Sequence, residues 1–237
     1  MILLTGFYTD TIAARRDELA TCLRLNLANP HFERVCLLVE DATDPLQIQR
    51  SVPHPQHAKL RMKPLGRRAR YSDFFEYANG LGAGHKIVVA NADIWFDETL
   101  SRVRTQRLEK RLLCLSRWDV QANGRTLFYY CVDSQDAWIF VTPIPHFPCD
   151  FSLGTPGCDN RIAWEAEHAG LEVSNPSLSI RANHLHLSAV RHYSLESRLE
   201  GPRSKLPASH IGGGLTAIGD VISRVRVGLW PRAVDGR

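Results

Sequence analysis

Apolar runs and helix-forming stretches alternate along the first half of the chain. The apolar runs show little alternation with polar residues, which is typical of strands buried on both faces of a parallel sheet. The stretches between them have apolar residues three and four apart, as in an amphipathic helix. The predicted elements, in chain order, are a strand at 2–8, a helix at 12–29, a strand at 34–39, a helix at 71–79 and a strand at 86–94. This order predicts an α/β fold with a mostly parallel central sheet, right-handed crossovers and flanking helices.

The rest of the chain is less regular. Residues 45–64 hold four prolines and are predicted to form an irregular connector. The second half is predicted to contain strands at 111–116 and 137–141, a loop at 143–157, a helix at 161–170 and a strand from Leu171. After residue 200 the sequence turns to Pro, Gly, Ser and Arg, so we place one domain at 1–199 and a peripheral tail at 200–237.

The composition is that of an ordinary globular protein. Of 237 residues, 44% are hydrophobic and 23% are charged, and no window approaches the roughly 18 apolar residues that a membrane-spanning helix needs. The sequence opens with no basic segment before its first apolar run, so we expect a cytoplasmic protein. The cysteines are scattered without a C-x-x-C pair, which predicts reduced thiols and supports neither disulfides nor a zinc site.

The excess of positive charge is mild. The net charge is +4 and the isoelectric point is near 8.8, with arginines gathered at 61–70 and in the C-terminal tail. Neither place has the interleaved aromatic residues typical of nucleic-acid binding, so we expect no nucleic-acid partner. Phosphate on a small ligand or on a lipid is the favoured anionic partner.

Polar residues follow the third predicted strand directly, as Asn91-Ala92-Asp93. Open α/β sheets bind ligands at the carboxyl ends of their strands, which makes Asp93 a candidate site residue. The alternative is that Asp93 only begins a turn. Asp97, further on, is better explained as the N-cap of a short helix.

Five segments follow the predicted elements in a fixed order. They are Leu4–Tyr8 with the helix residues Arg16, Glu18 and Leu19, the acidic turn Val39–Asp44, the helix that ends at Asn79, the Asn91-Ala92-Asp93 motif, and Gly157–Arg161 before a helix that ends at Gly170. Together they resemble the nucleotide-sugar glycosyltransferases of the A-type fold, in the broad bacterial group related to family 2, over residues 2–193. The resemblance implies a single-domain A-type fold in which 1–100 bind the nucleotide sugar and 101–199 bind the acceptor and the metal.

The resemblance also implies an activity. Such an enzyme moves a sugar from a nucleoside diphosphate sugar to a glycan, lipid-linked or other hydroxyl acceptor, as in polysaccharide biosynthesis. The donor contacts that it implies are Thr5, Phe7, Tyr8, Glu40, Asp41, Asn79, Asn91 and Ala92. In two departures, Asn91 replaces the first Asp of the family's Asp-x-Asp motif, and Asp159 lacks the usual adjacent Glu. Metal dependence therefore stays open.

Asp93 is the expected ligand for Mn²⁺ or Mg²⁺. These ions prefer oxygen ligands, and they stabilise the negative charge that grows on a diphosphate leaving group. Alternation in a strand places His184 and His186 on one face, and the family often completes its metal site with a late histidine. The two histidines are the further candidate ligands, with hydrogen-bonded core histidines as the alternative.

Asp159 is the expected general base of an inverting transfer. A carboxylate in a cleft can take the proton of the acceptor hydroxyl as the sugar is attacked. The alternative is a helix N-cap, in which case its pKa would be held down and its strength as a base reduced.

Charged and aromatic residues elsewhere complete the hypothesis. Arginine can fork onto two phosphate oxygens, and an indole ring can pack on a sugar face. The candidates for the donor diphosphate are Arg67, Arg70, Arg191 and Tyr193, and those for the acceptor are Asp133, Asp136 and Trp138. The alternative for the diphosphate candidates is that they are solvated loop residues. The alternative for the acceptor candidates is that they occupy turn or core positions.

Two other functions compete. A non-catalytic nucleotide-sugar or carbohydrate-binding protein of the same fold is the main alternative, because Asn91 removes one anionic ligand. A sugar-phosphate nucleotidylyltransferase is disfavoured, because the first strand is followed by one glycine and no nearby lysine. The spacing of apolar residues in 210–237 also predicts an amphipathic helix, which either lies on the inner face of the membrane or packs on the domain or on a second subunit. The oligomeric state stays open.

Overall fold

The computed structural model describes residues 1–40, 45–190 and 195–212. The strands are β1 (Ile2–Phe7), β2 (Arg34–Val39), β3 (Leu60–Pro64), β4 (Lys86–Ala90), β5 (Ile94–Phe96), β6 (Arg111–Leu115), β7 (Arg117–Val120), β8 (Thr126–Phe128), β9 (Ala137–Val141), β10 (Glu172–Ser174) and β11 (Ala182–His184). The helices are α1 (Ala13–Ala28), α2 (Pro45–Arg50), α3 (Tyr71–Gly80) and α4 (Cys158–His168), with 3₁₀ helices at His54–Lys59, Glu98–Thr105 and Leu195–Ser197.

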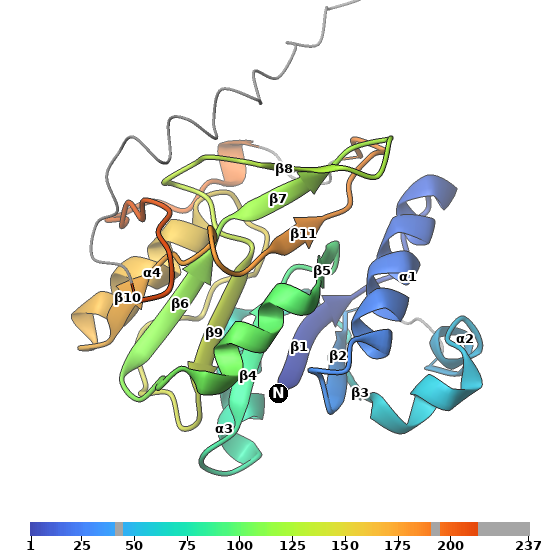
Figure 1. The fold of residues 1–237 in the computed structure, drawn as a ribbon, viewed down its shortest axis with the longest axis horizontal. Coiled ribbons are helices and arrows are strands. Elements are labelled where there is room, and N and C mark those ends of the chain that lie inside the picture. Colours follow the sequence, from blue (N-terminus) through green and yellow to red (C-terminus); the bar gives the residue numbers. More distant parts are fainter. Residues whose placement is uncertain (41–44, 191–194, 213–237) are drawn as a thin grey trace, which may run out of the picture.

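A seven-stranded sheet forms the centre of the protein, in the order β10-β6-β9-β4-β1-β2-β3 (Figure 1). All neighbours in it are parallel except at β9, which runs antiparallel to both β4 and β6. The predicted α/β class with a mostly parallel central sheet is therefore confirmed. A four-stranded sheet, β5-β11-β7-β8, lies beyond the carboxyl ends of the central strands, because β5 follows β4 and β7 follows β6.

Helices cover both faces of the central sheet. α3 and α4 pack on one face, around the fully buried Trp138, and α1 and the 3₁₀ helix Glu98–Thr105 pack on the other. Along β1, Ile2 and Leu4 face the first of these layers and Leu3 faces the second. Burial on both faces is the reason that the strands read as continuous apolar runs.

The segment predicted to be an irregular connector is ordered. It contains α2, a 3₁₀ helix and β3, which pairs with β2 at the edge of the sheet. The prolines stand where they are tolerated: Pro45 is the first residue of α2, Pro53 precedes the 3₁₀ helix, and Pro64 ends an edge strand. The prediction was wrong because a proline count does not distinguish a loop from elements that end at prolines.

The strand predicted at 86–94 is two strands. β4 ends at Ala90, and a turn, closed by a 3.1 Å hydrogen bond from the amide of Ile94 to the carbonyl of Asn91, leads into β5. Asp93 lies in this turn. The antiparallel pair β7–β8 was not predicted. In β7 charged and apolar residues alternate over only four positions, and the apolar run that begins with Leu127 of β8 was not assigned to a strand.

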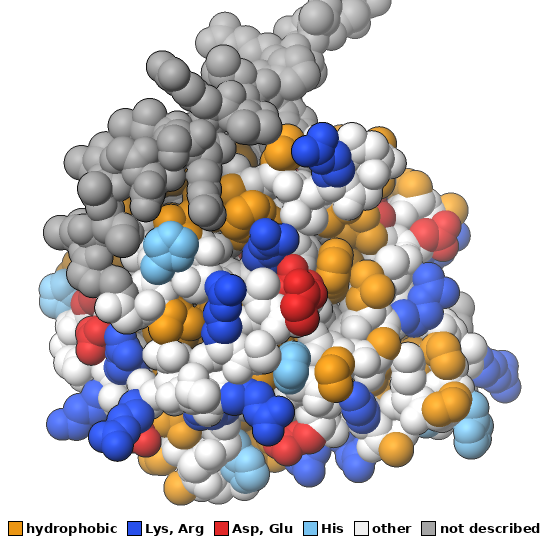
Figure 2. Space-filling view, viewed as in Figure 1, with side chains coloured by type: hydrophobic (Ala, Val, Ile, Leu, Met, Phe, Trp, Pro, Cys, Tyr) orange, Lys and Arg blue, Asp and Glu red, His pale blue; other side chains and the backbone are white. Residues whose placement is uncertain are grey.

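The charged surface is mixed, and Figure 2 shows Lys and Arg side chains spread over one face rather than gathered in a single patch. In the described ranges no helix has the length and hydropathy needed to cross a bilayer. The six cysteines are free, and four of them are buried. Ser204 and Leu206 are also buried, so the packed part of the chain extends past Leu199. The predicted amphipathic helix falls almost wholly in 213–237, outside the described residues.

Candidate active site

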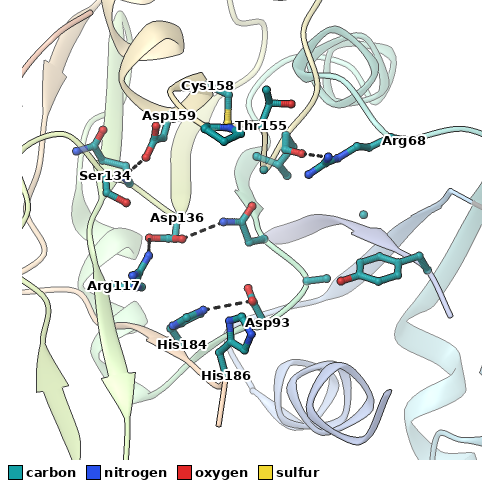
Figure 3. Close-up of a pocket in the computed structure, with 18 of the residues that line it drawn as sticks. Arg68, Asp93, Arg117, Ser134, Asp136, Thr155, Cys158, Asp159, His184 and His186 are labelled. Atoms are coloured by element: carbon teal, nitrogen blue, oxygen red, sulfur yellow. Dashed lines mark hydrogen bonds and ion pairs between the residues drawn. The ribbon is translucent and has the colours of Figure 1, made fainter. Parts of the chain in front are cut away.

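A pocket of about 850 Å³ opens at the carboxyl ends of the central strands (Figure 3). Tyr8 follows β1, Asn91 and Asp93 lie in the turn after β4, and Arg117 begins β7 just after β6. Asp136 immediately precedes β9, whose antiparallel direction brings its amino end to the same edge. The topology therefore places side chains from four strand ends in one cavity, as expected for an open α/β sheet.

Asp93 is buried and has two charged partners at one carboxylate oxygen. Its Oδ2 lies 2.6 Å from Nη2 of Arg15 and 3.2 Å from Nε2 of His184. Burial opposes its ionisation, but His184 and Arg15 outweigh burial and hold the pKa of Asp93 well below its usual range. Asp93 is therefore anionic at neutral pH.

Helix α1 supplies the cation beside Asp93. Arg15 and Glu18 lie one turn apart and are both buried, and Nη1 of Arg15 donates to Oε2 of Glu18 at 2.9 Å. Glu18 also accepts hydrogen bonds from the amide of Ser188, at 2.6 Å, and from its hydroxyl, at 2.8 Å. These bonds fix the segment after β11, which carries His186, against α1.

One ring nitrogen of each histidine is hydrogen-bonded to an acceptor oxygen on the side away from Asp93. Nδ1 of His184 lies 2.7 Å from Oδ1 of Asp119, and Nε2 of His186 lies 2.7 Å from the carbonyl oxygen of Val190. A carboxylate and a carbonyl only accept, so these two nitrogens carry protons and donate. When the rings are neutral, the lone pairs are on Nε2 of His184 and Nδ1 of His186.

Asp93, His184 and His186 fit a divalent transition-metal ion. Each offers one ligand atom, and these atoms lie within 4.8 Å of one another. The carboxylate suits Mn²⁺, imidazole is a common ligand of transition metals, and a carboxylate or carbonyl behind each imidazole is typical of metal-bound histidines. Burial lowers the pKa of His184, but Asp93 and Asp119 outweigh it and raise the value to about 9. A cation would therefore displace a proton from His184.

Asp136 links this cluster to the other end of the pocket. Its Oδ1 accepts a 3.0 Å hydrogen bond from the side-chain amide of Asn91, and its Oδ2 lies 3.5 Å from Nη1 of Arg117. Nε of Arg117 lies 3.0 Å from Oδ1 of Asp119, the carboxylate behind His184. Carboxylates and cations therefore alternate across the pocket, which limits the net charge that is buried there.

Asp159 lies in the first turn of α4 on the pocket wall. The N-cap of that helix is Gly157, whose φ of 80° is in the left-handed region, so Asp159 is not the cap. Its Oδ2 accepts from the amide of Gln135 at 3.1 Å and its Oδ1 from the amide of Asn160 at 3.0 Å. Burial and the neighbouring charge of Asp136 nevertheless raise the pKa of Asp159 to about 6.

Gly6, Tyr8, Glu40 and Arg68 also line the pocket, and Figure 3 shows Arg68 and Asp159 on opposite sides of it. Oε1 of Glu40 accepts from the amide of Ala69 at 3.2 Å, and a Cβ atom on Gly6 would lie 2.5 Å from the same oxygen. Only glycine at this position lets the carboxylate lie against β1.

Five residues predicted to bind the donor do not line this pocket. Thr5 is buried in β1, and Phe7 packs on the core. Arg67 pairs with the carboxylate of Asp73 at 2.7 Å and Arg70 with that of Asp150 at 2.8 Å, both near the surface. At the carboxyl end of α3, the side-chain amide of Asn79 donates to the carbonyl of Ile144, and its oxygen accepts from the amide of Ile144. Arg68, between the two predicted arginines, lines the pocket instead.

Two of the three acceptor candidates, Asp133 and Asp136, line the pocket, as does the donor candidate Ala92. Trp138 contributes to the wall but is 0% exposed and meets the ring of Tyr71 edge-on at 5.0 Å, so its faces are covered by the core. The remaining predicted residues, Asp41, Arg191 and Tyr193, lie outside the described residues.

The sequence did not assign five charged residues that line the pocket, nor Asp119, which lies behind His184. The five are Asp10, Arg15, Arg68, Arg117 and Arg198. Arg15 and Glu18 stand three apart in a predicted helix, a spacing that pairs them, but nothing local indicates that the pair is buried. Arg117 and Asp119 lie two apart, as on one face of a strand, in the pair β7–β8 that the pattern did not reveal.

No protein-family model and no curated protein matches the chain. Among solved structures, it is similar to the mannosyltransferase PcManGT from Pyrobaculum calidifontis in complex with GDP-Man and Mn²⁺, with 12% identity over 78% of this chain and 56% of that chain and a TM-score of 0.48. S. aureus TarS 1–349 in complex with UDP-GlcNAc matches at 12% identity over 95% and 64%, with a TM-score of 0.45. The galactosyltransferase LgtC with donor and acceptor sugar analogs matches at 10% identity over 88% and 87%, with a TM-score of 0.40.

The chain spans a little over half of the length of the first of these structures. Sequence identities and TM-scores this low do not indicate an activity. The function is therefore inferred from the chemistry of the pocket.

Proposed function

We propose that the pocket transfers a sugar from a nucleoside diphosphate sugar to a hydroxyl acceptor. One observation supports this most: a candidate cation site and a carboxylate with a raised pKa share one cavity and are linked through Asp136. The cation site would meet the diphosphate, and Asp159 would meet the acceptor. An inverting transfer needs the base and the cation on opposite sides of the sugar, because the acceptor attacks from the face opposite to the leaving diphosphate.

The donor half of the site follows from charge and position. A divalent cation held by Asp93, His184 and His186 would neutralise the charge on the leaving diphosphate. Arg15 adds a fixed positive charge beside Asp93. Glu40, held by the amide of Ala69, offers carboxylate oxygen to hydroxyl or N–H groups of the nucleoside.

The acceptor half depends on Asp159. With a pKa of about 6, most of this group is ionised at neutral pH, yet it is a stronger base than an ordinary aspartate. Asp159 takes the proton of the acceptor hydroxyl while the oxygen attacks the anomeric carbon, and the diphosphate leaves from the opposite face. Arg117 and Asn91 hold the carboxylate of Asp136 in place, and Asp136 in turn supports the raised pKa of Asp159.

Release of nucleoside diphosphate from a donor panel tests the proposal. GDP-mannose and UDP-GlcNAc are the first probes, each with Mn²⁺, Mg²⁺ or a chelator. We expect one donor to be cleaved by the wild type and the rate to fall at least a hundredfold in Asp159→Asn and in Asp93→Asn. Glu172→Gln, the same change of carboxylate to amide on an exposed strand, is the control and should match the wild type. No cleavage of any donor would overturn the proposal.

A second candidate is a protein that binds nucleotide sugars without turnover. Two contacts favour it: the amide of Asn91 is used on Asp136, and the guanidinium of Arg15 already lies 2.6 Å from Asp93. Binding of a donor by calorimetry, with no cleavage in any metal, would establish this alternative.

A further inference from the structure

Four arginines of the described residues line the pocket, and two of them are paired with carboxylates. Arg15 and Arg117 each meet two carboxylates within 3.5 Å. Arg68 and Arg198 are exposed, and within the described ranges neither forms an ion pair with a carboxylate. An unpaired guanidinium at the wall of a cavity attracts an anion, so these two side chains indicate an anionic ligand.

One loop, 153–157, holds both arginines and leads directly into α4. Nε of Arg68 donates to the carbonyl of Leu153 at 3.0 Å. The amide of Leu199, the residue after the second arginine, donates to the carbonyl of Pro156 at 3.0 Å. These two hydrogen bonds therefore place both arginines against the same loop.

Two glycines of this loop lie against the arginine side chains. A Cβ atom on Gly154 would lie 2.6 Å from Nη2 of Arg68. A Cβ atom on Gly157 would lie 3.6 Å from Nε of Arg198. The φ angles of these glycines, 76° and 80°, are in the left-handed region that favours glycine. The two guanidinium groups therefore flank one loop on the pocket wall.

The same loop leads to Asp159, on the acceptor side of the pocket. Figure 3 shows Thr155, which belongs to this loop, between Arg68 and Asp159. The same view shows Asp93 and His186 across the cavity. A diphosphate at the cation site would therefore lie away from the loop. An anion bound by the two arginines would instead belong to the ligand whose hydroxyl meets Asp159.

The chemistry of the guanidinium group limits what this anion can be. A guanidinium forks onto two oxygens of a phosphate or of a carboxylate. Arg68 uses Nε on Leu153, and its Nη groups have no acceptor among the residues that the structure describes. A neutral acceptor would leave the two positive charges without a bound partner, whereas an oxyanion pairs with them.

We propose that Arg68 and Arg198 bind an oxyanion, a phosphate or a carboxylate, on the acceptor whose hydroxyl reaches Asp159. The acceptor is then an anionic molecule, with its charged group at the 153–157 loop and its reacting hydroxyl at the base. This rests on the proposed function for the identity of the ligand as an acceptor. The oxyanion site itself binds whether or not the pocket cleaves a donor.

Saturation-transfer NMR on the full chain, with a chelator and without donor, tests this site. The probes are methyl glucoside, glucose 6-phosphate and glucuronate, which share a ring and differ in charge; the tighter of the two anions identifies the oxyanion. We expect at least one anionic probe to bind the wild type about tenfold more tightly than methyl glucoside. Arg68→Gln and Arg198→Gln should each remove most of this preference. Arg61→Gln is the matched control and should keep it, because Arg61 is also exposed and bonded to backbone carbonyls but does not line the pocket.

Calorimetry with UDP or GDP and Mn²⁺ separates the acceptor from the donor. Nucleotide affinity should stay unchanged in both arginine variants, and a loss as large as that of the anionic probe would assign the arginines to the donor and overturn the site. Equal binding of neutral and anionic probes to the wild type, or an unchanged preference in either variant, would also overturn it. A preference for anionic probes without cleavage of any donor would instead refute the proposed function and leave the oxyanion site standing.

Discussion

Asp159→Asn should make the protein more stable and less active at the same time. In the native state the pKa of Asp159 is raised from 3.8 to about 6 by burial and by Asp136, so its ionised form is disfavoured in the fold. The native state then binds more protons than the unfolded state between these two values. Stability therefore falls as the pH rises from about 4 to about 6, and the loss is complete above that range.

The magnitude follows from the same values. At 1.36 kcal/mol per pH unit, the difference between 3.8 and about 6 corresponds to about 3 kcal/mol of lost stability at pH 8. Asparagine removes that loss but can accept only one of the two amide hydrogen bonds, from Gln135 and Asn160, which costs about 1 kcal/mol. The net gain of about 2 kcal/mol should raise Tm by roughly 4–8 °C for a chain of this length.

Thermal unfolding of wild type and Asp159→Asn from pH 4 to pH 8 measures this gain. The two curves should separate as the pH rises from about 4 to about 6 and stay apart up to pH 8, with the variant more stable, while donor cleavage falls at least a hundredfold. A variant that is equally or less stable than the wild type at pH 8 would contradict the raised pKa of Asp159. The ionised carboxylate would then stabilise the fold instead of destabilising it.

Three further substitutions test other parts of the pocket. Asp93→Asn should weaken Mn²⁺ binding at least tenfold in calorimetry, since it removes the anionic ligand; equal affinity would place the ion elsewhere. Arg15→Met should lower the free energy of unfolding in urea by about 3 kcal/mol, because it leaves Asp93 and Glu18 buried without their shared cation; a change below about 1 kcal/mol would mean that the pair is not formed. Gly6→Ala should lower donor affinity by calorimetry with little change in Mn²⁺ affinity, because the new methyl displaces the carboxylate of Glu40; unchanged donor affinity would remove Glu40 from the nucleoside site.

The first half of the fold could be predicted because local pattern determines it. β2 runs over the predicted residues, α1 is one residue shorter than predicted at each end, and α3 is one residue longer. In the second half, β9 also runs over the predicted residues. The direction of β9 could not be predicted, because an apolar run reads the same in a parallel and in an antiparallel strand. That direction matters, since it brings Asp136 to the edge that holds Asp93.

Site residues could be predicted where a motif directly follows a strand. They could not be predicted where contacts between distant segments bring a side chain into the pocket. Asp97 was predicted to cap a helix, and its carboxylate does accept from the amide of Thr99 at 3.0 Å. Arg15 could not be assigned to the pocket, because its burial against Asp93 joins residues 78 positions apart. The pKa of Asp159 was likewise beyond the sequence, since it depends on desolvation and on Asp136, and neither is encoded near position 159.

The most direct test of the account is the set of atoms that bind Mn²⁺ in the pocket. Electron spin-echo spectra of the Mn²⁺-loaded protein with UDP or GDP should show ¹⁴N couplings from imidazole and ³¹P couplings from the diphosphate. The ¹⁴N signal should weaken in His186→Gln, and both signals should be lost in Asp93→Asn. Bound Mn²⁺ that shows no histidine nitrogen and no phosphorus would contradict the claim that Asp93, His184 and His186 hold a cation against a nucleoside diphosphate.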